Sequence, residues 1–77
     1  MGDIENMAMK IFYAYEDFYL DKDKSKIFED LFDRYLLKVH DGGQLGPYEA
    51  IVALGYRHSD EFHEMVRILK EQSLISD

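Results

Sequence analysis

The sequence predicts an all-α fold: a compact bundle of three to four helices in a single domain spanning residues 1–77, the last two forming a helix-turn-helix-like pair. Apolar residues recur at a spacing near 3.6, which places them on one face of a helix, and no useful stretch alternates as a strand would. With 47% hydrophobic residues and no cysteine, the chain must be stabilised by side-chain packing rather than by disulfides.

A first helix is predicted over residues 3–20. Its apolar stripe consists of Ile4, Met7, Ala8, Ile11, Ala14, Tyr15 and Phe18, and it is widened by Phe12 and Tyr19. The following residues, 21–25, contain no apolar side chain and include three residues of types that cap helices: Asp21, Asp23 and Ser25. We therefore expect a turn before the next helix.

A second helix is predicted over residues 25–40, and its apolar face is broad. That face contains Ile27, Phe28, Leu31, Phe32, Tyr35, Leu36 and Val39. Gly42 and Gly43 are expected to end this helix with a left-handed cap. His40, close to that end, would interact favourably with the helix dipole.

A short third helix is predicted over residues 47–54. It begins with Pro47, whose missing N–H does no harm at the first helical position. Gly55 is expected to end the helix. The side chains expected to face inward are Tyr48, Ile51, Val52 and Tyr56.

A fourth helix is predicted over residues 60–72, with Ser59 as its cap. Asp60 and Glu61 lie in its first turn, where carboxylates interact favourably with the helix dipole. Its inward stripe consists of Phe62, Met65, Val66 and Leu69. Residues 73–77 are expected to fray.

The last two helices contain the spacing of a helix-turn-helix. The run from Gly55 and Tyr56 to Phe62 and Val66 resembles the turn and recognition helix of AraC-type regulators, and the resemblance implies a small DNA-binding regulator. A recognition helix enters the major groove by its N-terminal residues. Here those residues are Asp60, Glu61 and Glu64, which would repel DNA, so a nucleic-acid partner is not expected and the regulator stays an alternative.

Two clusters imitate metal sites without completing them. Asp21, Asp23 and Ser25 resemble the start of a calcium loop, but its sixth and twelfth positions hold Lys26 and Phe32 instead of Gly and Glu. The types of side chain that bind zinc gather at His58, Asp60, Glu61, His63 and Glu64. Its two histidines are five residues apart rather than one helical turn apart, so we expect no metal site.

Catalysis is not expected either. A general acid or base needs a water-poor pocket that moves its pKa toward neutral, whereas most Asp and Glu residues here fall on polar helix faces. The sequence contains no nucleophile elbow and no glycine-rich phosphate loop. We predict a protein without enzymatic activity, cofactor or small-molecule substrate.

The chain is acidic, with sixteen Asp and Glu against nine Lys and Arg and a net charge of −7. This sign disfavours binding to a phosphate backbone. It allows the opposite alternative, an acidic mimic of nucleic acid that blocks a DNA- or RNA-binding protein. The carboxylates available for mimicry are Glu5, Glu16, Asp17, Asp60, Glu61 and Glu64.

Several apolar side chains lie off the predicted core stripes. Met9, Tyr13 and Leu20 fall opposite the main stripe of the first helix, Leu37 falls opposite that of the second, and Ile68 lies beside Met65 at the edge of the fourth. A helix that is apolar on two sides is buried centrally or contacts a partner. We therefore predict a protein-binding module, a regulator, adaptor or inhibitor of a larger protein or a homodimer, with these six residues as its contacts.

The location expected from the sequence is the cytoplasm. The chain begins with acidic residues rather than with the basic and apolar regions of a signal peptide. Charges interrupt every apolar segment well before the roughly 18 residues that a membrane span needs. We expect no membrane partner.

Overall fold

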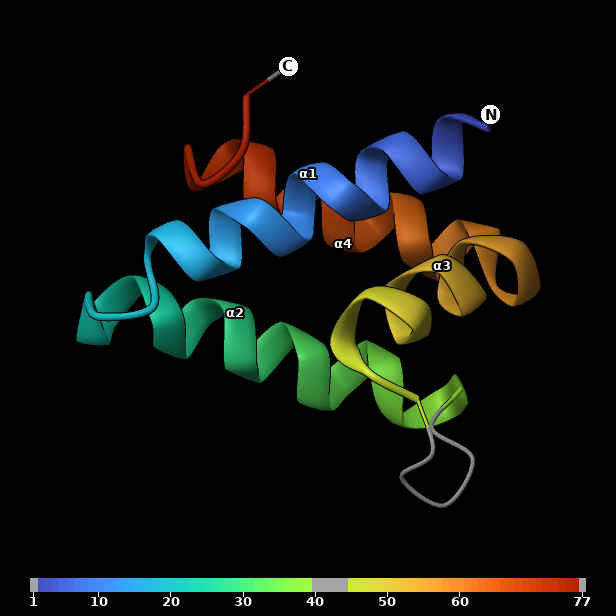
Figure 1. Ribbon diagram of the computed structural model, residues 1–77, viewed down its shortest axis with the longest axis horizontal. Helices are drawn as coiled ribbons and strands as arrows, with labels where there is room; N and C mark the ends of the chain where they lie inside the picture. The colour runs from blue at the N-terminus through green and yellow to red at the C-terminus, as the bar shows by residue number, and fades with distance from the viewer. Residues whose placement is uncertain (1, 40–44, 77) are drawn as a thin grey trace.

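The computed structural model describes residues 2–39 and 45–76, and the described part is all-α, as predicted. The elements, in chain order, are α1 (Asp3–Asp17), α2 (Lys22–Tyr35), the 3₁₀ helix η1 (Leu36–Val39), α3 (Pro47–Arg57) and α4 (Ser59–Glu71). In Figure 1, α1 lies in front of α4, α2 runs below both, and α3 lies at the side where α2 and η1 end.

The turn between α1 and α2 differs from the prediction at both ends. α1 ends at Asp17 rather than at residue 20, and Phe18 is its C-cap. α2 begins at Lys22 rather than at residue 25 because Asp21 is its N-cap, with Oδ1 accepting a hydrogen bond of 3.1 Å from the Lys24 N–H. Asp21 thus satisfies a helix terminus instead of starting a calcium loop.

The end of the second helix tightens into η1. Leu36 and Val39 are buried, whereas Leu37 between them is exposed. Since a 3₁₀ turn places residues three apart on one side, Leu36 and Val39 can face the core together. The predictions for His40, Gly42 and Gly43 lie outside the described residues.

The prediction that Gly55 ends the third helix is wrong, because α3 continues through it to Arg57. Gly55 is buried, and a Cβ at this position would collide with the Cγ2 methyl of Ile4 on α1. The glycine therefore permits close approach of two helices rather than ending one of them.

The start of the fourth helix also differs from the prediction. Ser59 is its first residue and His58 is its N-cap, with no side-chain capping hydrogen bond. Since α3 ends at Arg57, one residue separates the two helices, which pack against each other. The helix-turn-helix-like pair is thus present with a very short connection.

The C-terminal segment does not fray as predicted, because Leu74 and Ile75 are buried. Ser73 has a φ of 59° directly after the end of α4. The Leu74 N–H donates to the Leu69 carbonyl and the Ser73 N–H to the Lys70 carbonyl, the two bonds of a Schellman motif. This cap turns the chain back so that its last apolar side chains reach the core.

Aromatic rings fill the space between α1 and α2. Tyr15 packs against Phe28 and Phe32, with ring centroids 5.6 and 5.2 Å apart, and Phe18 stacks on Phe28 at 6.5 Å. The core as a whole consists of Ala8, Ile11, Phe28, Leu31, Tyr35, Leu36, Val39, Ala50, Ile51, Leu54, Phe62, Met65, Val66, Leu69, Leu74 and Ile75. All five elements contribute to it, so one face of α1 is committed to the fold.

Candidate protein-binding surface

Four of the six predicted contact residues are accessible. The exposed fraction is 44% for Met9, 55% for Tyr13, 91% for Leu20 and 70% for Leu37. Met65 is fully buried, so its predicted place on the surface is wrong. Its side chain lies in the core because the inward stripe of α4 includes it.

Ile68 occupies an intermediate position. It is partly buried and packs against the core cluster. Most of its apolar surface is therefore covered within the molecule, and it lies on α4 rather than on α1.

Two exposed side chains were expected to face inward. Tyr19 lies in the turn after α1, and Tyr56 lies near the end of α3; both have an exposed fraction of 60%. Phe12 is only partly buried and does not belong to the hydrophobics that pack against the core. Phe12 thus lies outside the core on the same helix as Met9 and Tyr13, and Tyr19 lies outside it in the turn that follows that helix.

These residues define a surface that we call the α1 stripe: Met9, Phe12, Tyr13, Glu16 and Tyr19. Residues 9, 12, 16 and 19 are separated by three, four and three positions, the spacing of a coiled-coil seam. The sequence contains this spacing, but Phe12 and Tyr19 also lie close to the inward stripe on a helical projection, so the sequence assigns them to the inward stripe.

A hollow of about 350 Å³ is part of this surface. Phe12, Tyr15, Glu16 and Tyr19 line it, from two adjacent turns of the chain. The Tyr15 and Tyr19 rings meet edge to face at 5.9 Å, and the Phe12 ring lies 6.2 Å from that of Tyr13. The rings support one another, so the hollow has aromatic walls and one carboxylate.

Tyr15 connects this hollow to the core and to a second hollow. Its ring contacts Phe32, which lines a neighbouring hollow of about 350 Å³ together with Leu36, Leu37 and Pro47. Burial raises the pKa of the Tyr15 hydroxyl, and the nearby Glu29 carboxylate raises it further. The contact between Tyr15 and Phe32 therefore joins a wall of one hollow to a wall of the other, and exposed Leu37 lines the second hollow.

Near the N-terminal end of α1, Tyr56 of α3 forms a hydrogen bond with that helix. Its hydroxyl donates a hydrogen bond of 2.6 Å to Oε2 of Glu5, while Oε1 is shielded from solvent without a partner among the described residues. The hydrogen bond holds the pKa of Glu5 below its ordinary value and raises the pKa of Tyr56. Glu5 lies one turn before Met9, so the exposed Tyr56 side chain lies near the N-terminal end of the α1 stripe.

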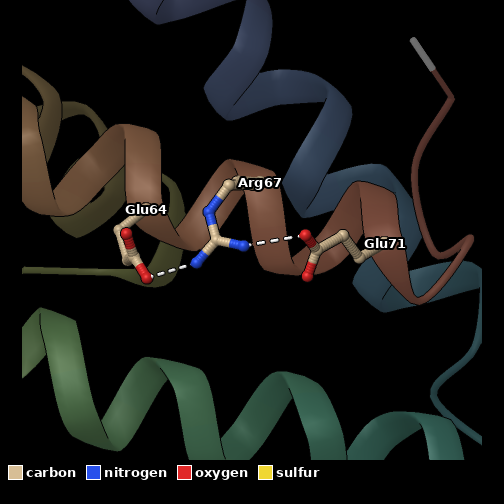
Figure 2. Close-up of polar contacts among 3 residues, drawn as sticks. All are labelled: Glu64, Arg67 and Glu71. Carbon is tan, nitrogen blue, oxygen red and sulfur yellow. Dashed lines mark hydrogen bonds and ion pairs between the residues drawn. The ribbon is translucent and has the colours of Figure 1, made fainter.

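The acidic residues of α4 are mostly paired. Figure 2 shows Arg67 between Glu64 and Glu71, at 2.5 and 2.8 Å, on the side of α4 facing away from the α1 ribbon. Glu61 bonds to Lys38 at 2.5 Å. The side chain of Glu16, by contrast, is exposed and makes no hydrogen bond or ion pair with any described residue.

Nothing in the described ranges resembles a metal centre. No group of three His, Asp or Glu side chains there is arranged to hold an ion. In the cluster of zinc-binding residue types, for which the sequence predicts no metal site, His63 Nδ1 lies 2.7 Å from the Ser59 carbonyl oxygen, and His58 lies 3.6 Å from Glu61. These two rings face different partners instead of converging.

Within residues 2–39 and 45–76, no helix combines the length and apolar character needed to cross a membrane. Comparisons with protein-family models, with curated proteins and with solved structures gave no match.

Proposed function

We propose that this chain is a non-catalytic protein-binding module that docks a partner on the α1 stripe. One observation carries the proposal. Among the described residues, the exposed large hydrophobics Met9, Tyr13, Tyr19 and Leu20 all lie on α1 or in the turn after it, and Tyr56 is bonded to α1 through Glu5. The two other exposed large hydrophobics of the described residues lie on other elements, Tyr56 on α3 and Leu37 on η1.

Clustering distinguishes this surface from the singly exposed apolar residues that every protein carries. The opposite face of α1 already packs against the core through Ala8 and Ile11. The exposed side chains therefore add little to folding, and covering them would remove apolar area from water. Methionine and the aromatic residues are also the types enriched at protein interfaces.

The charges favour apolar docking over mimicry of nucleic acid. A mimic needs uncompensated carboxylates, but Arg67 pairs with Glu64 and Glu71, and Lys38 pairs with Glu61. The acids of α4 are thus partly neutralised on their own surface.

We retain the cytoplasm as the proposed location, because a chain without cysteine forms no disulfides and does not depend on an oxidising compartment.

Site-specific photo-crosslinking tests the proposal. A photoreactive phenylalanine analogue replaces Tyr13 in one variant and Glu71, on the far side of α4, in the control, and both are expressed in the native cells. We expect a discrete crosslinked species from position 13 that position 71 does not give. Equal crosslinking at both positions, or none at position 13, would contradict the proposal.

A further inference from the structure

We infer that the partner segment is an amphipathic helix with an apolar face for the α1 stripe and a Lys or Arg placed to meet Glu16. This inference rests on the proposed function and specifies the chemistry of the partner. Three features support it: the shape of the aromatic hollow on α1, the position of Glu16 within the α1 stripe, and the further carboxylates on this side of the molecule.

The shape of the hollow fits a side chain presented by another helix. Phe12, Tyr15, Glu16 and Tyr19 stand at positions i, i+3, i+4 and i+7. In knobs-into-holes packing, four residues at this spacing form the hole that receives a single side chain. Here α1 supplies three of them, and Tyr19 supplies the fourth from the turn that follows the helix. Met9, Phe12, Tyr13 and Glu16 repeat the same spacing one turn earlier. A partner helix aligned with α1 could therefore insert successive apolar side chains.

The length of α1 is sufficient for this mode of docking. Its 15 residues span about 22 Å at ~1.5 Å per residue. That corresponds to about four turns, enough for anchors at i, i+3 or i+4 and i+7 on the partner, as in helix-in-groove recognition. An extended strand would find no free sheet edge here, because the described residues contain only helices.

The charge requirement comes from Glu16. It occupies a seam position between Phe12 and Tyr19, so a docked helix would cover its carboxylate. Covering a charge with apolar groups leaves it desolvated and unpaired, which is unfavourable. A Lys or Arg on the partner would meet this charge. Glu29 acts electrostatically on Tyr15, which lines the same hollow as Glu16, and Asp33 lines the neighbouring hollow, so both carboxylates also favour a basic partner.

A second copy of this chain fits the α1 stripe poorly. In a two-fold dimer the same patch lies on both sides of the interface. Each copy carries a net charge of −7 and brings its own Glu16 to the contact. Like charges would then meet where opposite charges are needed, so we commit to a basic helix from another protein.

A designed peptide tests the inference on the full chain. The probe is a fluorescently labelled synthetic helix of about 21 residues, a length that is helical in water when rich in Ala. It carries Leu at one seam and Lys beside the central Leu; a matched peptide carries Glu in place of Lys. Binding is followed by fluorescence anisotropy at nanomolar peptide, so that the peptide stays monomeric.

We expect the Lys peptide to bind the wild type more tightly than the Glu peptide does. Glu16→Lys should weaken binding of the Lys peptide by at least about threefold and reverse the preference between peptides. Glu71→Lys changes the net charge equally but lies across the molecule, and it should leave the preference intact. Tyr13→Ser should weaken both peptides.

Three results would overturn the inference. Equal effects of Glu16→Lys and Glu71→Lys would mean that net charge alone attracts the peptide, and no binding of the Lys peptide would exclude a basic helix. A dimer of the protein alone that Tyr13→Ser dissociates in sedimentation would assign the surface to a second copy. If crosslinking at position 13 still captures a partner, the proposed function survives any of these; if it does not, both fail.

Discussion

The hydrogen bond between Tyr56 and Glu5 joins the last turn of α3 to the first turn of α1. Because the phenol donates to the carboxylate, it stabilises the ionised form of Glu5 and the neutral form of Tyr56. Backbone groups of Glu5 itself and of the N-cap residue Gly2 contribute to the same lowering of the Glu5 pKa. This contact thus couples the protonation of the Glu5 carboxyl on α1 to that of the Tyr56 hydroxyl on α3.

The pH dependence follows from the directions of the two pKa shifts. The lowered Glu5 pKa contributes stability that is present above the ordinary carboxyl pKa and is lost as the pH falls through the folded value. The raised Tyr56 pKa contributes stability that is present below the ordinary phenol pKa and is lost as the pH rises through the folded value. Between these limits the pair is intact.

Tyr56→Phe should therefore move the Glu5 pKa up toward its ordinary value, because the donor that stabilises the carboxylate is gone. The measurement is an NMR titration of the Glu5 side-chain carboxyl in both proteins. Tyr19→Phe, which removes an exposed hydroxyl from the other end of α1, is the matched control and should leave the Glu5 pKa unchanged. An unaltered Glu5 titration in Tyr56→Phe would show that the hydrogen bond does not form in solution.

At the scale of the elements, α1 and α3 depend on one glycine for their close approach. Gly55→Ala in an ordinary helix interior would stabilise by about 1 kcal/mol. Here the new methyl would meet the β-branched Ile4, whose Cγ2 cannot swing aside freely. We expect net destabilisation of about 1–3 kcal/mol, as for other overpacked cores.

Thermal unfolding measures this effect. The midpoint of Gly55→Ala should fall by several degrees, since ~1 kcal/mol corresponds to roughly 4–8 °C in a domain of this size. Adding Ile4→Ala to Gly55→Ala should recover part of the loss relative to the sum of the single changes, because the clash is removed. A midpoint that rises in Gly55→Ala would refute the packing described for this contact.

The helices were predictable, and several of their ends were not. Periodicity located all four, since a helix displays its apolar face locally in the sequence. The role of Gly55 depends on Ile4, which is far away in the chain, and no local rule reveals such a contact. The burial of Leu74 likewise depends on Ser73 adopting a left-handed conformation, for which Gly is the usual residue.

At the scale of the whole molecule, the candidate surface was predicted in part. Met9 and Tyr13 lie so far round α1 from the core stripe that a helical projection alone exposes them. Phe12 and Tyr19 lie at the boundary between the two faces. Which boundary residues become buried depends on where neighbouring helices pack, and the sequence of one helix does not contain that information. The sequence placed Met65 both in the inward stripe of the fourth helix and among the contacts, and only its inward position is confirmed.

α1 has two faces, one that packs in the core and one that we propose for a partner. The double substitution Met9→Ser with Tyr13→Ser removes exposed side chains only, so the helical circular dichroism and the unfolding midpoint should stay close to those of the wild type. An equal loss of stability and binding would mean that these side chains serve the fold instead.

The most direct test of the α1 stripe is the dissociation constant, by calorimetric titration, between the double-substituted protein and the partner identified by crosslinking at position 13. Interface residues of this type contribute enough that we predict binding at least about tenfold weaker than to the wild type, or about 1.4 kcal/mol. A dissociation constant equal to that of the wild type would contradict the account.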